Sequence, residues 1–438
     1  MLRPLPDRDR STSIVFVVLL LGFLLAFGRI TPDPATLAGF DPDKLGRIDE
    51  ALEEAVASEQ IPGGVALVFS RGKEAYLAIA GYRDGSRRKP VERSTLFRIA
   101  SMTKPITAAA ALTLVDDGRI GLDDPVANYL PEFAAMQVLD GKPDAGDARV
   151  PADCPITVRH LLNHTAGFTY RFADHPVLGP LYAEFGISDG LAETPGTMEQ
   201  NVRRLARLPL ASQPGTAWTY SLSSDVLGRV IEVASGQRLD DFIRDRITGP
   251  LKMVDTHFVV PREKRGRLAD LFTLGEDQKV RPHAPGLIQE GPLIFSGTFP
   301  TWDTGTYRSG GAGLTSTIDD YARFVRMLMN RGELDGVRIL RPETVAAMTS
   351  DQCAPVLVPD WGHGDGYGFG LGVVTPANRF HNPAGVGTFG WAGFFHTFFW
   401  ADPKNGLFGI LLTNIQPSGH LTPLRETFKR TVYEARLR

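Results

Sequence analysis

The sequence predicts an α+β fold in which one antiparallel β-sheet is flanked by helices and carries an inserted, mostly helical lobe. Paired apolar runs typical of β-hairpins lie near both ends of the chain, at residues 65–80 and 394–413. A helix is predicted beside each hairpin, and the long segment between them is predicted to be mostly helical. The simplest architecture that joins these parts is a sheet built from both ends of the chain, with the middle as a second lobe.

Residues 1–28 are predicted to be a signal peptide or an N-terminal membrane anchor. An uncharged apolar stretch at 14–27 follows a basic start, which contains Arg3, Arg8 and Arg10. This stretch is short for a membrane span, and the small residues Ala26 and Gly28 fit a signal-peptidase site. A cleaved signal would release the protein, whereas an uncleaved segment would tether it to the outer face of the membrane. Both alternatives predict an exported protein, periplasmic or extracellular.

Residues 29–40 are predicted to be a linker, and residues 41–438 one domain. The domain begins with an amphipathic helix, because apolar residues recur there at helical spacing, namely Leu45, Ile48, Leu52 and Val56. A hairpin follows, with strands at 65–69 and 75–80 around the turn 70–73.

Further along, a helix is predicted to begin at or near Ser101, to run through an alanine-rich stretch and to end near Gly118. The C-terminal hairpin pairs 394–400 with 407–413 around a turn rich in Asp, Pro, Asn and Gly. A last helix follows, with Thr422 as N-cap and Pro423 at its first position. Two remaining segments are predicted to be loops over a cleft, 168–200 and 280–310.

Composition excludes several classes of protein. Hydrophobic residues make up 43% and charged residues 22% of the 438, which is typical of a folded globular chain. The formal net charge of −3 is spread without a concentrated basic face, so no nucleic-acid partner is expected. Cys154 and Cys353 could form one bridge or remain two separate thiols. Neither belongs to a CxxC pair, and we expect no metal and no cofactor.

The pattern Ser-x-x-Lys can carry chemistry only on a helix, where residues three apart share a face. It occurs three times, beginning at Ser70, Ser86 and Ser101. Ser70 lies in the predicted hairpin turn, and Ser86 lies in a polar stretch that ends at a proline. Only Ser101 and Lys104 lead into a predicted helix. Burial and the positive helix end should lower the lysine pKa, so that a neutral amine can accept the serine proton.

Several blocks of the sequence resemble the serine β-lactamase-related family, which includes class C β-lactamases, D-Ala-D-Ala peptidases and β-lactamase-fold esterases. The blocks follow the family's order over roughly residues 40 to 435. They lie at 97–104 (FRIASMTK), 116–118 (DDG), 160–167 (HLLNHTAG), 218–221 (WTYS), 225–228 (DVLG), 310–314 (GGAGL) and 390–393 (GWAG). The resemblance implies a β-lactamase/transpeptidase-like fold, in agreement with the architecture inferred above.

The resemblance also implies roles for individual residues. Tyr220 matches the family's second motif and should face Lys104, forming with it the acid/base pair for a Ser101 acyl-enzyme. Tyr307 is a rival that fits the same local pattern but lies just before the glycine-rich block. Trp391 and Gly393 occupy the third motif, and the backbone N–H of Phe394 should pair with that of Ser101 as the oxyanion hole. Ser221 is implied as a further substrate-binding residue.

Two departures from the family pattern bear on the substrate. Leu222 replaces the asparagine of the second motif, and Trp391 replaces the cation that binds a substrate carboxylate. The lost charge-assisted contact is worth about 1.5–3 kcal/mol. These changes favour an esterase or acyl transferase for neutral acyl substrates over a D-amino-acid peptidase or β-lactamase. His396 could line the acyl pocket or pack within its strand, and the second alternative is favoured.

Other chemistries find little support. No Gly-x-Ser-x-Gly occurs, which disfavours an α/β-hydrolase. His160 and His164 lack the glutamate of a zinc metalloprotease and are expected to be structural. The intact Ser101, Lys104 and Tyr220 argue against a catalytically dead binding protein. The expected partner is a small-molecule ester or amide; the oligomeric state stays open.

Overall fold

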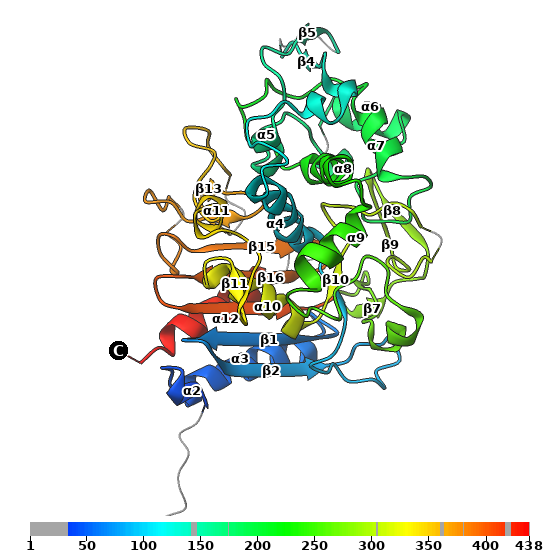
Figure 1. The fold of residues 1–438 in the computed structure, drawn as a ribbon. Coiled ribbons are helices and arrows are strands. Elements are labelled where there is room, and N and C mark those ends of the chain that lie inside the picture. The colour runs from blue at the N-terminus through cyan, green and yellow to red at the C-terminus, as the bar shows by residue number, and fades with distance from the viewer. Residues whose placement is uncertain are drawn as a thin grey trace, which may run out of the picture.

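The computed structural model describes residues 34–141, 147–173, 175–303, 305–359, 363–379, 381–416 and 422–437. A seven-stranded antiparallel sheet forms its base (Figure 1). Its strands, in sheet order, are β13 (Gly366–Tyr367), β14 (Gly372–Val373), β15 (Phe389–Gly393), β16 (Thr397–Asp402), β17 (Leu407–Leu412), β1 (Gly63–Ser70) and β2 (Lys73–Gly81). Strand β1 pairs with β17 from Val65↔Leu412 to Ser70↔Leu407, so the two ends of the chain share one sheet, as predicted.

The turn between β1 and β2 has a clear local cause. Arg71 and Gly72 have φ angles of 51° and 78°. Two consecutive left-handed residues make the tight turn whose twist matches that of the flanking strands. Ser70 and Lys73 are therefore cross-strand neighbours at the hairpin end and not neighbours on a helix face.

The C-terminal hairpin differs from the prediction at its start. The strand was expected from residue 394, whereas β16 begins at Thr397. Residues 394–396 form the tight turn between β15 and β16, closed by a hydrogen bond from His396 N to Gly393 O of 3.1 Å. His396 has a φ of 62°, which an extended strand does not allow. The strand was predicted to include these residues because the segment is rich in aromatic side chains, which are common in strands.

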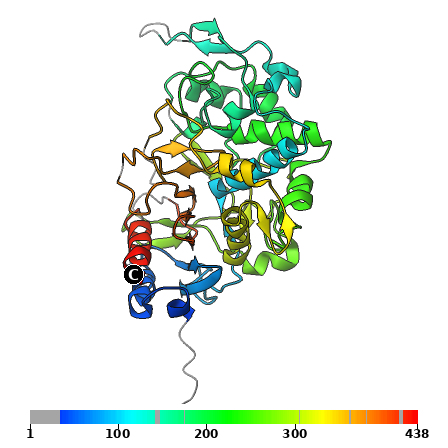
Figure 2. The same ribbon diagram turned by 60° about the vertical axis from the view of Figure 1, so that its left-hand side comes forward.

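Helices cover both faces of the sheet. On one side α3 (Pro42–Ala57) and α12 (Thr422–Glu434) lie next to each other, which places the first and last long helices of the domain side by side (Figure 2). Both helices were predicted. Apolar residues of both pack with the outer side of β1, β16 and β17 in one cluster. On the other side lie α4 (Thr103–Asp116) and α10 (Ile318–Met329).

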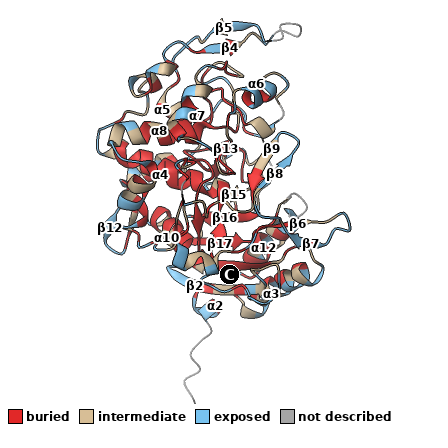
Figure 3. Cartoon of the chain, turned by 90° about the vertical axis from the view of Figure 1, so that its right-hand side faces the viewer, coloured by how far each residue is buried: buried red, intermediate tan, exposed pale blue. Residues whose placement is uncertain are grey.

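The predicted helical lobe lies between β3 and β10 in sequence. Its helices are α5 (Val158–Leu162), α6 (Leu178–Glu184), α7 (Met198–Leu205), α8 (Ser223–Ser235) and α9 (Leu239–Ile243). Helix α4 joins the lobe to the sheet and is buried from Thr103 to Leu114 (Figure 3). Because this helix is packed on all sides, the side chains at its N-terminal end are held in a rigid position.

The remaining elements are short. They are the helices α2 (Pro34–Leu37) and α11 (Pro342–Met348), and five strand pairs, β3 (Phe97–Arg98) with β10 (Thr315–Ser316), β4 (Gln137–Leu139) with β5 (Arg149–Pro151), β6 (Phe272–Leu274) with β7 (Val280–Pro282), β8 (Leu287–Glu290) with β9 (Leu293–Ser296), and β11 (Glu333–Leu334) with β12 (Val337–Arg338).

Two predicted loops contain regular structure. Segment 168–200 holds α6, and segment 280–310 holds the β8–β9 hairpin. Gly291, with a φ of 58°, lies in the hairpin turn between two apolar runs, a signal that the loop prediction overlooked. The predicted signal or anchor, 1–28, lies outside the described residues. Within the described ranges, no helix has the length and apolar character needed to cross a membrane.

Candidate active site

Ser101 lies at the start of the buried helix α4. A short 3₁₀ turn, Ala100–Met102, leads directly into α4, as the sequence predicted. Pro105 falls within the first helical turn, where its missing N–H costs no intrahelical hydrogen bond. Ala100 has a φ of 41°, an unfavourable conformation for a residue with a Cβ. Such a strained bend next to a reactive group is typical of functional sites and turns Ser101 toward the cleft.

The Lys104 amine lies next to Ser101. Its Nζ is 3.2 Å from Ser101 Oγ and donates a second hydrogen bond of 2.8 Å to the carbonyl oxygen of Gly311. The side chain is 1% exposed. Burial lowers the pKa of Lys104 to about 7, while the negative charge of Asp225 acts in the opposite direction. This shift favours the neutral amine, which can accept a proton.

Gly311 allows the glycine-rich segment to approach this amine. A Cβ at this position would lie 2.8 Å from Asp225 Oδ2 and 3.4 Å from Lys104 Nζ. Thr107 Oγ1 donates to the carbonyl of Gly310 at 2.7 Å and holds the segment against α4. The 310–314 block thus supplies a carbonyl acceptor for the lysine.

Tyr220 faces Lys104 from the lobe. The Lys104 nitrogen lies 4.4 Å from the centre of the Tyr220 ring, within cation–π distance. Burial raises the pKa of the phenol, and hydrogen-bonding interactions with Ser101 and Trp391 act against that rise. The ring is packed by aromatic neighbours with ring centres 5.1–5.5 Å away, namely His164, Tyr170 and Trp391.

The rival tyrosine has a different position. The Tyr307 hydroxyl donates to Asp225 Oδ1 at 3.0 Å and accepts from Asn201 Nδ2 at 3.1 Å. It is buried and does not line the cleft cavity. Burial raises the pKa of Asp225 to about 6, and the hydroxyl of Ser309, the Lys104 charge and the Tyr307 hydroxyl oppose this. Tyr307 therefore supports Asp225, whereas Tyr220 faces the space in front of Ser101.

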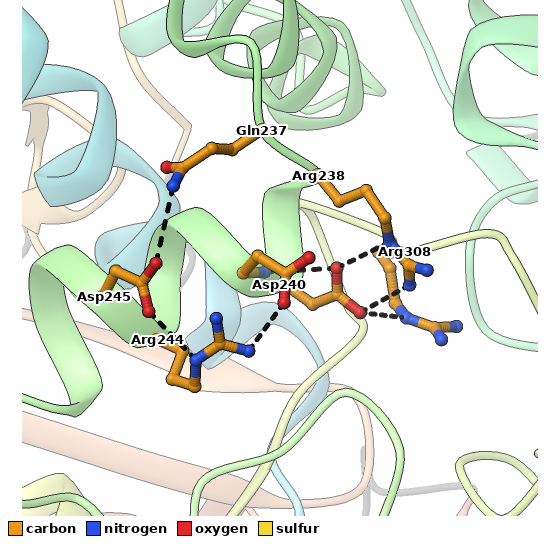
Figure 4. A network of polar contacts seen from close by, with 7 residues as sticks. Gln237, Arg238, Asp240, Arg244, Asp245 and Arg308 are labelled. Carbon is orange, nitrogen blue, oxygen red and sulfur yellow. Dashed lines mark hydrogen bonds and ion pairs between the residues drawn. The ribbon is translucent and has the colours of Figure 1, made fainter.

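Arg308 anchors the glycine-rich segment to the lobe. Its Nε donates to Asp240 Oδ2 at 2.9 Å, and Asp240 belongs to helix α9 (Figure 4). The Arg308 side chain is 11% exposed, so this pair is shielded from solvent more than the neighbouring pair of Arg244 and Asp241. The network ties together the segment that carries Gly311 and the helices behind it.

A cavity of about 190 Å³ opens in front of these groups. Its lining includes Ser101 and Tyr220 together with three residues predicted for substrate binding, Trp391, Gly393 and Phe394. Ser221, also predicted, is 1% exposed and does not belong to this lining. Its hydroxyl instead contacts His164 Nδ1 at 3.2 Å and Ser223 Oγ at 2.9 Å.

Gly393 has a reason for being glycine that the sequence did not reveal. A Cβ there would lie 2.2 Å from the carbonyl oxygen of Ile99 and 2.1 Å from Thr397 Oγ1. The absence of a side chain lets strand β15 touch the backbone two residues before Ser101. The two backbone stretches that carry Ser101 and Phe394 are thereby held together.

The other histidines singled out in the sequence are structural. His160 accepts from Thr157 N in the capping box of α5, and His164 is 1% exposed among aromatic rings. His396 is fully buried, with Nδ1 3.3 Å from Thr413 Oγ1, in agreement with the favoured packing role. Cys154 and Cys353 are free thiols, one exposed and one buried. Among the described residues, no group of three His, Cys, Asp or Glu side chains is placed to hold a metal ion.

The sequence did not indicate the position of Asp225, or that Asp189, His363 and Arg425 line the cavity. Asp225 belongs to a quoted block, but its place behind Lys104 follows only from packing. Asp189 lines the cavity and accepts the backbone N–H groups of Arg171 and Phe172 at 3.0 and 3.3 Å, while burial raises its pKa to about 7. His363 and Arg425 line it too, from the loop before β13 and from α12. No local pattern in the sequence marks them.

Comparison with known proteins places the chain in a family. A family model described as Beta-lactamase matches residues 48–433. The chain is 33% identical over 406 residues to esterase EstB of Burkholderia gladioli, covering 92% of this chain and 98% of the relative. It is 38% identical over 376 residues to protein Rv1367c of Mycobacterium tuberculosis (strain ATCC 25618 / H37Rv), covering 84% and 88%. The structure of EstCE1, a hydrolase with promiscuous acyltransferase activity, matches with a TM-score of 0.76 and 30% identity over 89% of this chain and 99% of that one.

The fold and the site define a serine hydrolase. The chain belongs to the Beta-lactamase family and has the β-lactamase/transpeptidase-like fold, which confirms the predicted fold class and the predicted resemblance. The relatives also confirm the predicted class of enzyme, a serine hydrolase of the esterase and acyltransferase kind.

Proposed function

We propose that this protein is an ester hydrolase or acyl transferase that forms an acyl-enzyme on Ser101. The single observation that carries the proposal is the contact of a buried amine with the Ser101 hydroxyl, at the edge of a cavity that Tyr220 also lines. EstB is named an esterase, and EstCE1 is described as a hydrolase with acyltransferase activity, which supports the same reaction here.

The geometry supports a two-step reaction. Ser101 Oγ attacks the ester carbonyl carbon, and its proton passes to the pair formed by Lys104 and Tyr220. The carbonyl oxygen becomes an oxyanion, stabilised by the backbone N–H groups of Ser101 and Phe394. When the C–O bond breaks, the same pair returns the proton to the leaving alcohol. Water or a second alcohol then attacks the acyl-serine, with Lys104 and Tyr220 again accepting and returning the proton.

The lining favours an apolar, neutral acyl group. Leu191 belongs to an apolar cluster that also contains Ala100, the residue directly before the nucleophile. Phe394 packs against the same cluster. Phe172 packs on this cluster and lines the same cavity. Trp391 stands where related enzymes place a cation, and its interaction with Tyr220 favours the ionised phenol. The site thus favours an ester over a β-lactam or a D-amino-acid amide.

Residues 1–28 are proposed to export the protein, either as a cleaved signal or as an anchor to the outer face of the membrane. The basic start and the apolar stretch 14–27 support this proposal.

Labelling tests the proposal directly. The full chain is exposed to a fluorophosphonate, its intact mass is measured and the adduct is mapped by digestion. We expect one adduct, on Ser101, and hydrolysis of 4-nitrophenyl acetate but not of nitrocefin. Faster turnover of nitrocefin would favour a β-lactamase, and the absence of both labelling and turnover would favour a binding protein.

A further inference from the structure

A buried carboxylate in the cleft takes no part in the proposed proton transfer. Asp189 is 7% exposed and lines the same cavity as Ser101. Burial raises the pKa of its carboxyl to about 7, and hydrogen bonds from the backbone N–H groups of Arg171 and Phe172 act against this rise. Because a buried carboxylate costs free energy unless polar groups solvate it, these two donors indicate what the residue does.

The two donors lie at the start of a short turn. Arg171–Ala173 is a 3₁₀ turn, and the first N–H groups of a helical turn have no acceptor within it. Asp189 Oδ1 accepts from Arg171 N at 3.0 Å, and Asp189 Oδ2 accepts from Phe172 N at 3.3 Å. The carboxylate therefore caps the turn from a position 17 or 18 residues further along the chain, with each oxygen holding one of the two groups.

The turn carries two of the rings that line the cavity. Tyr170 and Phe172 stack on each other, with ring centres 4.6 Å apart and an angle of 15° between the ring planes. The centre of the Tyr170 ring lies 5.3 Å from that of Tyr220 and 5.4 Å from Lys104 Nζ. Phe172 packs against the apolar cluster that contains Ala100. We call Tyr170 and Phe172 the aromatic wall of the cleft.

The backbone on each side of Asp189 is itself fixed. Ser188 N donates to Asn201 Oδ1 at 2.9 Å, and Asn201 Nδ2 donates to Ser188 O at 3.1 Å. On the other side Gly190 has a φ of 77°, and a Cβ there would lie 2.3 Å from the Ser309 hydroxyl oxygen. This close approach needs a glycine. The Asp189 carboxylate therefore holds the aromatic wall from a backbone that is anchored on both sides.

We propose that Asp189 is a positioning residue, which fixes the aromatic wall and thereby sets which acyl groups the cleft accepts. This inference rests on the proposed esterase function, in which the apolar lining near Ser101 receives the acyl group. A wall held at two backbone positions keeps its rings at a fixed distance from the nucleophile. An acyl chain long enough to reach Phe172 then gains packing contacts that a shorter chain lacks. The carboxylate acts through these rings and not on the reacting atoms.

Acyl selectivity tests the proposal on the full chain. The measurement compares kcat/KM for 4-nitrophenyl acetate and 4-nitrophenyl butyrate, which have the same leaving group. Asp189→Ala should lower kcat/KM for the butyrate by roughly 10-fold and change that for the acetate less than about threefold, because only the longer chain contacts the wall. Asp189→Asn keeps one acceptor oxygen and should fall between the wild type and Asp189→Ala. An equal loss for both esters, or an unchanged selectivity, would overturn the proposal.

A double-mutant cycle separates positioning from direct contact with the substrate. Phe172→Ala removes one ring of the wall and should itself reduce the preference for butyrate. Because Asp189 acts through the wall, adding Asp189→Ala to Phe172→Ala should change the selectivity by less than about a further twofold. Independent effects of the two substitutions would instead place Asp189 in direct contact with the substrate, and the proposal would be wrong.

Asp84 provides a matched control. Its Oδ1 accepts from Arg88 N at 3.0 Å and from Lys89 N at 2.7 Å, in a loop that does not line the cavity. Asp84→Ala thus removes hydrogen bonds of the same kind and should leave the acyl selectivity unchanged. A change of selectivity as large as that of Asp189→Ala would show that the effect is not specific to the wall and would overturn the proposal.

Hydrogen exchange separates this proposal from the esterase function, because it needs no turnover. Asp189→Ala should speed exchange of the Arg171 and Phe172 amides by roughly 10-fold, and Asp84→Ala should not. Unchanged exchange in Asp189→Ala overturns the proposal even if every ester is hydrolysed. Faster exchange in a chain that neither labels nor hydrolyses esters counts against the proposed function and not against the fixing of the wall. Should Asp189→Ala not fold, Asp189→Asn carries the same comparisons.

Discussion

The amine of Lys104 lies over the face of the Tyr220 ring, 4.4 Å from its centre, and 3.2 Å from the Ser101 hydroxyl oxygen. The three groups come from the helix that joins lobe and sheet and from the segment that precedes α8. Among the described residues no carboxylate forms an ion pair with this amine, which is held by the carbonyl of Gly311 and by burial. In the proposed mechanism Lys104 and Tyr220 therefore share one mobile proton.

The nucleophile can be tested against matched serines in the same chain. Replacing Ser101 with alanine should abolish fluorophosphonate labelling and reduce ester hydrolysis by roughly 10³-fold or more. Ser70→Ala and Ser86→Ala also remove the serine of a Ser-x-x-Lys pattern, but in a hairpin and an exposed loop, and they should retain both activities. Full hydrolysis by Ser101→Ala would contradict the mechanism.

The pH profile should report the lowered pKa of Lys104. Since the amine must be neutral to accept the proton, kcat/KM for a neutral ester should rise with pH through about 7 and then level off. Asp225 raises the Lys104 pKa through its charge, so Asp225→Asn should move the rise to lower pH. A shift to higher pH, measured on protein with unchanged thermal unfolding, would show that Asp225 acts otherwise.

Two tyrosines offer a comparison of hydroxyl roles. Tyr220→Phe should lower kcat by roughly 10²–10⁴-fold, because the phenol returns the proton to the leaving alcohol. Tyr307→Phe removes a hydrogen bond to Asp225 and should cost about 1 kcal/mol of unfolding free energy, with a much smaller change in kcat. Steady-state kinetics and denaturant unfolding of both variants check this. The reverse ranking in kcat would reassign the role to Tyr307.

The close approach at Gly393 predicts a steric effect. Gly393→Ala would place a methyl group 2.2 Å from the Ile99 carbonyl, and it should lower the free energy of unfolding by about 1–3 kcal/mol. Activity should fall as well, because β15 would move away from Ser101. Gly266 has open space around its Cα, so Gly266→Ala is the control and should leave unfolding and activity unchanged. Equal free energies of unfolding for the two variants would contradict the predicted steric clash at Gly393.

The pair of Arg308 and Asp240 should stabilise the glycine-rich segment. Arg308→Gln removes the more buried of the two arginine partners described for Asp240 and leaves the more exposed Arg238. We expect a loss of about 1–3 kcal/mol of unfolding free energy, between the values of exposed and buried ion pairs. Arg244→Gln removes an exposed arginine from the same network and should cost less than about 0.5 kcal/mol. Thermal unfolding measures both changes.

Part of the site was predictable because its two central residues are close together in the sequence. Ser101 and Lys104 are three residues apart, so a helix alone brings them together, and the surrounding composition distinguished this serine from Ser70 and Ser86. The family's blocks then supplied Tyr220 and the strand that ends at Gly393. The prediction was wrong where local composition misled: residues 394–396 are rich in aromatics but form a turn, and segment 280–310 contains a hairpin.

By itself, the sequence determined the hairpins at both ends and the helix that carries Ser101, because periodicity and short spacings are properties of single elements. The class of chemistry was implied by the resemblance of its motifs to a known family. Only the tertiary structure decided that the Gly311 carbonyl holds Lys104, that Tyr307 supports Asp225 instead of facing the cleft, that Ser221 is packed away, and that Arg425 enters the cavity. Each of these depends on contacts between segments far apart in the chain, whose distances are set by how the lobe, the sheet and α12 pack together.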